Sequence, residues 1–170
     1  AEAAAGLGAK ALIVHGGHVS KGDDLSVGVD NWIKTFERMT NPLPILIENT
    51  AGGTAAIARH LDRIARLWDA IGEYGPGFCL DTCHAHAGGE DLTGIVDRVT
   101  AITGRIDLIH ANDSRDTFDS GADRHTNIGT GFIEPEAIAA IVRAAGCDVL
   151  VETPAAGQAE DISYLRSKAS

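Results

Sequence analysis

Five short apolar runs, each followed at once by a carboxylate or an imidazole, constrain the fold of this chain more than any other feature. A continuous apolar run of this length is typical of a strand that is covered on both faces, as in a parallel sheet. The polar residues are separated by 33, 33, 29 and 42 residues, close to the length of one strand–helix unit. The runs are residues 11–14, 45–47, 78–80, 106–109 and 149–151, and the polar residues that follow them are His15, Glu48, Asp81, His110 and Glu152.

Amphipathic helices are predicted after these strands, because apolar residues recur there at spacings of three and four. The chain therefore repeats strand, loop and helix five times, and residues 1–10 resemble the end of a preceding helix. Two prolines in the segment 41–44 are expected to end the first helix of the repeat. The expected helices cover residues 29–39, 57–71, 92–102, 138–142 and 161–165.

This repeat predicts an α/β fold of the (β/α)8 TIM-barrel type, with about five βα units present. A barrel of about 250 residues divides into eight units of about 31 residues, which matches the observed spacing. A dinucleotide-binding sheet is disfavoured, because no GxGxxG segment follows any of the strands. Residues 1–170 are expected to form a single partial barrel domain that lacks three units at its amino end, since the chain starts with the end of a helix.

The formal net charge of −10 argues against broad, non-specific binding to nucleic acid, which normally requires a basic patch. Charge alone favours a small substrate. Carboxylates that bind a cation are neutralised by it, however, so part of this negative charge can belong to a metal site. The carboxylates in question are Glu48, Asp81, Asp123 and Glu152.

Membrane insertion and secretion are not expected. No run approaches the roughly 18 apolar residues of a membrane span, and the first ten residues lack the features of a signal peptide. Cys79, Cys83 and Cys147 have no disulfide-framework spacing and sit among apolar residues, so we expect buried free thiols in a reducing compartment. The predicted location is the cytoplasm.

The polar strand ends predict a metal centre. The carboxyl ends of parallel strands meet at one edge, and in βα barrels that edge carries the active site. Carboxylates and imidazoles gathered there would repel and dehydrate one another without a cation, and a mixed set of this kind suits zinc or manganese better than magnesium or calcium. The long loop 114–132, rich in polar residues, is expected to be functional. The candidate metal ligands are His15, Glu48, Asp81, His84, His110, Asp123, His125 and Glu152.

Other polar residues near these positions have structural interpretations. Any one candidate ligand taken alone is better explained as a cap or a satisfied core residue, and only the register of five strand ends favours a site. Asn112 and Asp113 are expected to brace the ligands rather than bind metal. His60 is interpreted as helix surface, and His18 and His86 as pocket wall. Packing is the expected role of the aromatic residues Trp32, Trp68 and Tyr74.

Several sequence blocks together resemble the endonuclease IV family, the zinc-dependent apurinic/apyrimidinic endonucleases of base-excision repair. Order, spacing and the residues after each block agree over essentially the whole chain. Single blocks would be weak signals, but the DTCH block together with the DRH block in the long loop is specific. The blocks are IENTAG at 47–52, LDTCHA at 80–85, HANDS at 110–114, DRH at 123–125 and VET at 151–153.

This resemblance implies a barrel with three zinc ions at its carboxyl face. Glu48 would bridge two of them, with His15 on the first ion. Asp81, His110 and Glu152 would complete the second site, and His84, Asp123 and His125 would hold the third. The implied reaction is hydrolysis of the phosphodiester 5′ to an abasic site in double-stranded DNA, with Glu48 and Glu152 as catalytic residues and the enzyme acting as a monomer.

The chain departs from the family pattern in two respects. The family's first zinc takes one more histidine from an earlier strand, which this chain does not contain, and His86 stands where the family usually has an aromatic residue. Two alternatives stay open. A xylose-isomerase-like sugar isomerase or epimerase uses similar ligands on the same fold, and the acidic charge favours it, whereas the DRH loop does not. The other alternative is an inactive fragment or binding module.

Overall fold

The five predicted strands form one parallel sheet in the computed structural model, which describes residues 1–40 and 43–168. Neighbouring strands follow one another in the order β1-β2-β3-β4-β7, and every pair is parallel. Since this is also their order along the chain, they form successive units of a βα barrel, and the predicted fold class is confirmed. The strands are β1 (Leu12–His15), β2 (Ile45–Glu48), β3 (Gly77–Asp81), β4 (Leu108–His110) and β7 (Asp148–Leu150).

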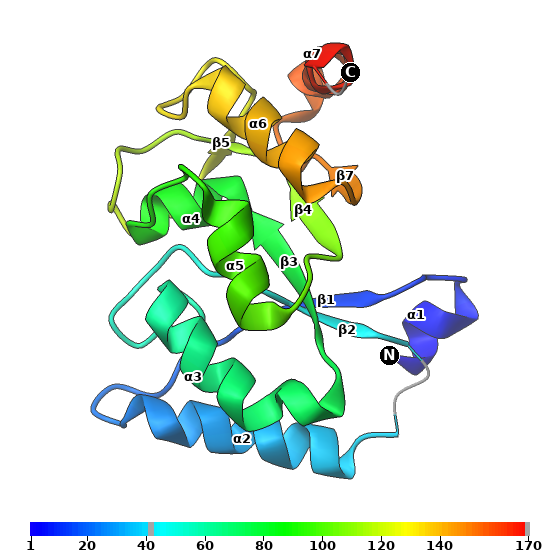
Figure 1. The fold of residues 1–170 in the computed structure, drawn as a ribbon, viewed down its shortest axis with the longest axis vertical. Helices are drawn as coiled ribbons and strands as arrows, with labels where there is room; N and C mark the ends of the chain where they lie inside the picture. The colour runs from blue at the N-terminus through cyan, green and yellow to red at the C-terminus, as the bar shows by residue number, and fades with distance from the viewer. Residues whose placement is uncertain (41–42, 169–170) are drawn as a thin grey trace.

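The helices form a layer that follows the order of the strands. Each of α2, α3, α5, α6 and α7 packs against the next, and Figure 1 shows α3, α5 and α6 alongside one another over the sheet. The short helix α1 lies at the amino end. The helices are α1 (Glu2–Gly6), α2 (Leu25–Arg38), α3 (Leu61–Ile71), α4 (Thr82–Gly88), α5 (Ile95–Thr103), α6 (Pro135–Ala145) and α7 (Gln158–Lys168), with single 3-10 turns at Gly72–Tyr74 and Ala155–Gly157.

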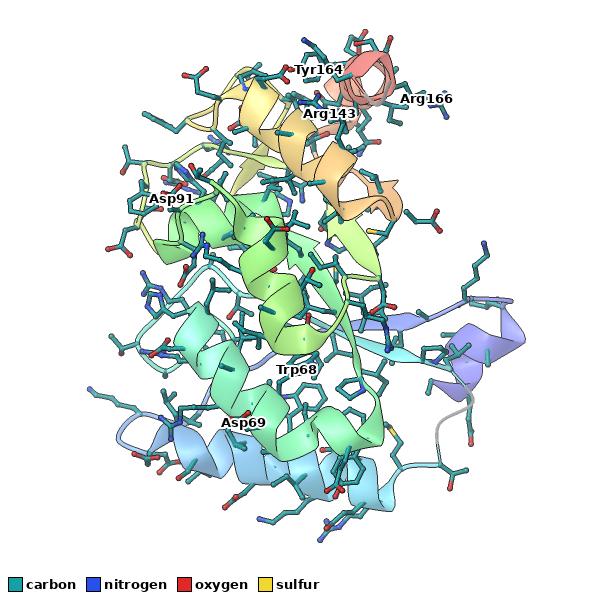
Figure 2. The ribbon with its side chains drawn as sticks, in the orientation of Figure 1. Trp68, Asp69, Asp91, Arg143, Tyr164 and Arg166 are labelled. Atoms are coloured by element: carbon teal, nitrogen blue, oxygen red, sulfur yellow. The ribbon has the colours of Figure 1, made fainter. Side chains whose placement is uncertain are left out.

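The core lies between the central strands and this helical layer. All residues of β2 and β3 are buried, whereas β7 is exposed and β1 alternates between half-buried and exposed residues. Trp68, labelled on α3 in Figure 2, meets the ring of Phe78 on β3 edge to face, at a centroid distance of 5.5 Å. The apolar stripe of α3 therefore packs where the sheet is covered on both faces, as the continuous apolar run at 78–80 predicts.

Two local predictions are wrong. The helix expected from residue 57 starts at Leu61, and the preceding segment is irregular, although Ile57 is still buried in the core. Helix α4 was not expected. All seven of its residues are buried, so it carries no amphipathic pattern that periodicity could detect. Asp81 begins it as the N-cap, because its Oδ1 accepts a hydrogen bond from the backbone N–H of His84 at 2.7 Å.

The remaining secondary-structure predictions differ from the structure only at their ends. Residues 113–126 contain a small antiparallel pair, β5 (Asp113–Ser114) with β6 (His125–Thr126), which begins one residue before the predicted functional loop and otherwise lies within it. The predicted helix break at 41–44 falls partly on residues 41 and 42, which lie outside the described residues. None of the described helices is both long and apolar enough to cross a membrane.

We predict that Phe78→Ala lowers the free energy of unfolding by about 3–5 kcal/mol, because the side chain is fully buried and its removal leaves a cavity against Trp68. Urea unfolding followed by circular dichroism measures the change. Phe132→Ala is the matched control, since that ring is 59% exposed. Equal losses in the two variants would contradict this account of the core.

Candidate metal centre

Four strands end on the residues that were predicted to close them. His15 pairs with Glu48 across β1 and β2, and Asp81 pairs with His110 across β3 and β4. Glu152 lies two residues beyond the end of β7. Because these strands are parallel and in register, their polar side chains meet at one edge of the sheet.

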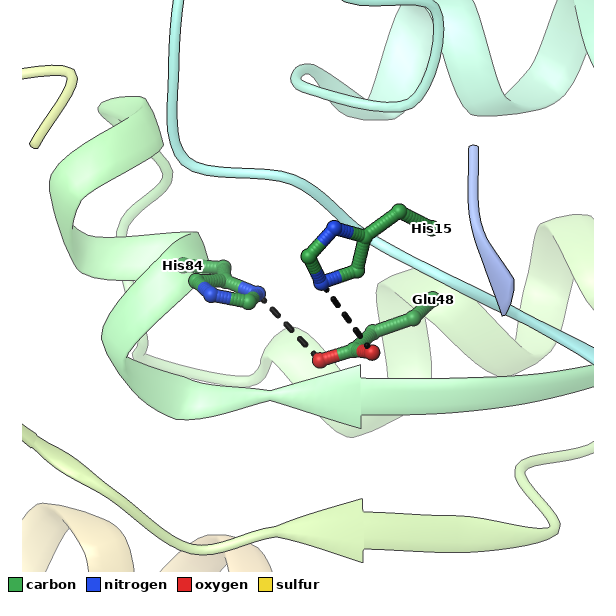
Figure 3. Close-up of side chains that lie close together, drawn as sticks. All are labelled: His15, Glu48 and His84. Carbon is green, nitrogen blue, oxygen red and sulfur yellow. Dashed lines mark ion pairs between the residues drawn. The ribbon is translucent and has the colours of Figure 1, made fainter. Parts of the chain in front are cut away.

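Glu48 occupies the centre of this group and offers its two carboxylate oxygens to different neighbours. Its Oε2 lies 3.4 Å from Nε2 of His15, and its Oε1 lies 3.3 Å from Nδ1 of His84 (Figure 3). The same Oε1 lies 3.0 Å from Nδ1 of His110. Burial raises the pKa of Glu48, but hydrogen bonds from His110 and His84 outweigh it and hold this pKa at about 2. The carboxylate is therefore charged and can serve two ions at once.

Glu48, Asp81, His110 and Glu152 form one compact donor set, with one ligand atom from each within 4.8 Å of all the others. Nδ1 of His110 lies 3.2 Å from Oε2 of Glu152 and 3.9 Å from Oδ2 of Asp81. Ligand atoms of a tetrahedral zinc ion at about 2.1 Å lie about 3.4 Å apart. Three carboxylates packed around one imidazole at these separations suit a divalent cation.

A second set joins His84 to the long loop. Nε2 of His84 lies 3.0 Å from Oδ1 of Asp123, and Nε2 of His125 lies 3.3 Å from the same oxygen. The two imidazole nitrogens lie 3.4 Å apart and face each other. These three spacings again match the edges of a zinc coordination polyhedron. We call His84, Asp123 and His125 the loop site.

The close spacing of the loop-site residues shifts their pKa values. Burial lowers the pKa of His84, but the charges and hydrogen bonds of Asp81, Asp123 and Glu48 outweigh it and raise this pKa to about 11. The pKa of His125 is raised as well, since its hydrogen bond to Asp123 and the charge of Asp81 outweigh burial. Hydrogen bonds from His125 and His84 hold the pKa of Asp123 well below its usual range.

Some donor side chains of the centre are buried, and others are exposed to solvent. Side chains of Glu48, Asp81, His84 and His110 are almost completely buried. In contrast, those of His15, Asp123 and Glu152 are 51%, 50% and 43% exposed. The donor sets are therefore open to solvent at His15, Asp123 and Glu152.

Two asparagines fix Asp81 from the neighbouring strands. Asn49 exchanges two hydrogen bonds with the backbone of Asp81, of 2.9 and 2.8 Å, and its carbonyl lies 3.0 Å from Nδ1 of His84. Asn112 donates to Oδ2 of Asp81 at 2.6 Å and accepts from the backbone N–H of Glu152 at 2.7 Å. Such partners orient ligands. The bracing role predicted for Asn112 has this geometry, whereas that of Asn49 was not predicted.

Asp113 braces the long loop rather than the donor sets. Its carboxylate accepts backbone hydrogen bonds from Gly129, Gly131 and Ile133, each of 2.9 or 3.0 Å. This closes the loop segment that follows His125. Asp113 therefore holds the loop backbone, whereas the sequence analysis expected it to brace the ligands themselves.

The histidines without strand-end register lie outside the donor sets. His60 is the N-cap residue of α3, not part of its exposed surface as expected, and its Nδ1 lies 3.7 Å from Oε1 of Glu90. Exposed His18 contacts the carbonyl of Gly52 at 3.1 Å. His86 is buried and contacts the carbonyl of Asp116 at 3.2 Å and the ring of Phe118.

Cys79 lies closer to the centre than the sequence indicated. Together with Glu48 and His110 it forms a further group with metal-ligand geometry. Burial and the neighbouring carboxylates raise the pKa of its thiol far above the usual value, so the sulfur is protonated. Cys79 and Cys83 are buried free thiols as predicted, and Cys147 is free but only half-buried.

A groove in the described structure lies away from these residues. It encloses about 680 Å³ between α5 and α6, and its walls include Leu92, Val96, Phe118, Phe132 and Ala137. Of the histidines, only His86 lines it. The chemistry of the donor sets, not the size of a cavity, therefore locates the candidate site.

The fold places this chain in the βα-barrel class, with donor sets that could hold metal ions, and comparison with known proteins gives its family. A family model described as xylose isomerase-like TIM barrel matches residues 1–168. The chain belongs to this family.

Sequence relatives narrow this further, and the resemblance to endonuclease IV is confirmed. The chain is 55% identical over 167 residues to a protein of Mycobacterium ulcerans named probable endonuclease 4, and 53% identical over 169 residues to one of Mycobacterium leprae with the same name. These alignments cover 98% and 99% of this chain. The chain spans 66% and 67% of the length of these relatives.

Solved structures agree with the fold. The crystal structure of endonuclease IV from Thermus thermophilus superposes with a TM-score of 0.80 at 27% sequence identity, and the match covers 98% of this chain and 64% of that one. A D-tagatose 3-epimerase-like protein also reaches a TM-score of 0.80, at 18% identity and with the same coverage. At that identity the second match shows the shared fold alone.

We predict that metal binding releases protons at neutral pH. The pKa of His84, raised to about 11, means that this imidazole is protonated in the metal-free chain, and a metal ion can bind to it only after it loses its proton. Burial lowers the pKa of His110, but Glu48 and the other nearby carboxylates outweigh it and raise this pKa as well. Apparent Zn²⁺ affinity should therefore rise as the pH increases from 6 to 8. Calorimetry in two buffers of different ionisation enthalpy measures the protons released. An affinity that is independent of pH, with no proton release, would contradict these protonation states.

Proposed function

We propose that this chain carries the metal centre of a zinc-dependent endonuclease of base-excision repair, which hydrolyses the phosphodiester 5′ to an abasic site in DNA. One observation carries the proposal. The donor set Glu48, Asp81, His110 and Glu152, found from atomic distances, has the same four members as the second zinc site implied by the family resemblance. The names of the mycobacterial relatives and of the Thermus structure support the same activity.

The donor sets fit zinc, with its preference for nitrogen and carboxylate ligands. Glu48 would be shared between the ion at Asp81, His110 and Glu152 and the ion at His15, and the loop site would hold a third. When bound, zinc ions supply an activated water and clamp the attacking and leaving oxygens of the phosphate. The set around His15 has Glu48 and His84 as its neighbours, and both of these residues also belong to the other sets.

The side chains of the donor sets would position the reacting groups, and the buried ones would keep water away from the inner side of the centre. Glu48, buried and charged, would fix the separation of the ions on either side of it. Glu152 is the most exposed member of its set and is held through its backbone by Asn112. We therefore assign its carboxylate to the face where the attacking water and the phosphate meet, and assign catalytic roles to Glu48 and Glu152.

The acidic chain can still bind DNA at the exposed donor residues His15, Asp123 and Glu152. The four carboxylates at the donor sets are neutralised by bound cations, which leaves a locally positive site for one phosphate. An abasic sugar can be turned out of the duplex at low cost, because no base must be unstacked. Double-stranded DNA with abasic sites is the proposed partner, and a cytoplasmic monomer is the proposed state.

We predict that Glu48→Gln lowers the rate of cleavage of a duplex with one abasic site by at least about 10³-fold. The amide has a similar shape but cannot provide a second anionic oxygen, so shared binding of two ions is lost. The measurement is incision of a labelled duplex by Zn²⁺-loaded protein. Glu136→Gln, which removes an exposed carboxylate on α6, is the control and should keep full activity. A wild-type rate in Glu48→Gln would overturn the bridging role.

Metal analysis separates this function from its alternatives. We predict that the purified chain retains zinc when dialysed against a mixture of zinc, manganese and magnesium, and that the loss of His125 removes about one equivalent. Retention of one or two manganese or magnesium ions, with no effect of His125→Ala, would favour the sugar isomerase. Elemental analysis that finds no retained metal would favour an inactive fragment.

A further inference from the structure

The carboxyl end of helix α4 is closed by the loop that carries Asp123 and His125. The last carbonyl groups of a helix have no partner within it and must find one elsewhere. In α4, the carbonyl of His86 accepts from the backbone N–H of Asp119 at 3.1 Å, and that of Ala87 accepts from Gly121 at 2.8 Å. Helix α4 also carries His84, and the loop carries Asp123 and His125. These contacts therefore join the two segments that supply the loop site.

Arg59 also contacts this end of the helix. Its Nε donates to the carbonyl of Gly88 at 3.1 Å, and its Nη2 donates to Oδ1 of Asp119 at 2.6 Å. The Arg59 side chain is only 13% exposed, although Asp119 itself is largely exposed. A guanidinium held by two directed hydrogen bonds joins the helix end and the loop more rigidly than an ammonium could.

The backbone of Asp119 is bent to make this contact. Among the described residues, Asp119 alone combines a side chain with a positive φ, of 58°. That conformation is unfavourable for residues other than glycine, and Asp tolerates it better than most. Gly89 provides the space, because a Cβ at that position would lie 2.7 Å from Oδ1 of Asp119.

We propose that Arg59 and Asp119 are positioning residues, whose ion pair holds the loop against α4 and so sets Asp123 and His125 opposite His84. The pair touches none of the ligand atoms. It acts through the loop backbone, four residues before Asp123 in the sequence. Its role at the metal rests on the proposed function, whereas its role in holding the loop does not.

The first experiment measures the loop in the metal-free chain. In Arg59→Ala the amide hydrogens of Asp119 and Gly121 should exchange about 10-fold faster, as expected for the loss of the one charge-assisted hydrogen bond by which Arg59 reaches the loop. Arg98→Ala is the matched control, since Arg98 pairs with Glu90 and donates to the carbonyl of Asp91, outside the loop. Exchange that is equal in the two variants would overturn the proposal.

Asp119→Gly removes the carboxylate and keeps the backbone conformation. It therefore tests the same ion pair if Arg59→Ala fails to fold. It should speed exchange at Gly121 as much as Arg59→Ala does, and the double variant should add nothing further. Additive effects would mean that the two residues act separately, which would overturn the proposal.

The second experiment measures Zn²⁺ affinity by competition with a chromophoric chelator. Arg59→Ala should weaken by about 10-fold the class of site that His125→Ala removes, and leave the other sites unchanged. Arg59→Lys should recover part of this loss. A loop site as tight in Arg59→Ala as in Arg98→Ala would overturn the positioning role. If the wild-type chain bound no Zn²⁺, the proposed function would fail, while the exchange comparison would still decide whether the pair holds the loop.

Discussion

The enclosed carboxylate of Glu48 is the constraint on which the rest of the site depends. A charged group cannot be buried at the end of a parallel strand unless partners compensate for its lost hydration. Here two imidazoles face one oxygen and a third faces the other. Those imidazoles come from β1, β4 and α4, so satisfying one carboxylate fixes the relative placement of three elements. The same arrangement, with its crowded donors, is what makes a cation site.

Much of the site could be predicted because parallel strands translate sequence spacing directly into position. The runs ending at His15, Glu48, Asp81 and His110 had to place those residues at one edge once the sheet was parallel. The polar groups beyond that edge could not be placed in this way. Helix α4 is buried on every side, so nothing in its sequence pattern distinguishes it from a loop.

Contacts between residues that are far apart in the sequence could also not be predicted. Arg59 and Asp119 are 60 residues apart, and only the folded loop brings them together. Asn49 lies in the IENTAG block next to Glu48, but the block alone does not show that its side chain bonds the backbone of Asp81 on the next strand. Such residues act through geometry that no short motif encodes. The family resemblance named the ligands but not the residues that hold them in place.

The dual bonding of Asp81 has a practical consequence for genetics. One of its oxygens caps α4 through the amide of His84, while the other receives Asn112 and faces His110. A single side chain therefore belongs both to the secondary structure and to a donor set. A replacement that cannot cap, such as Asp81→Ala, alters the start of a helix as well as the ligands, so an inactive variant of that kind would not by itself reveal which of the two had been lost.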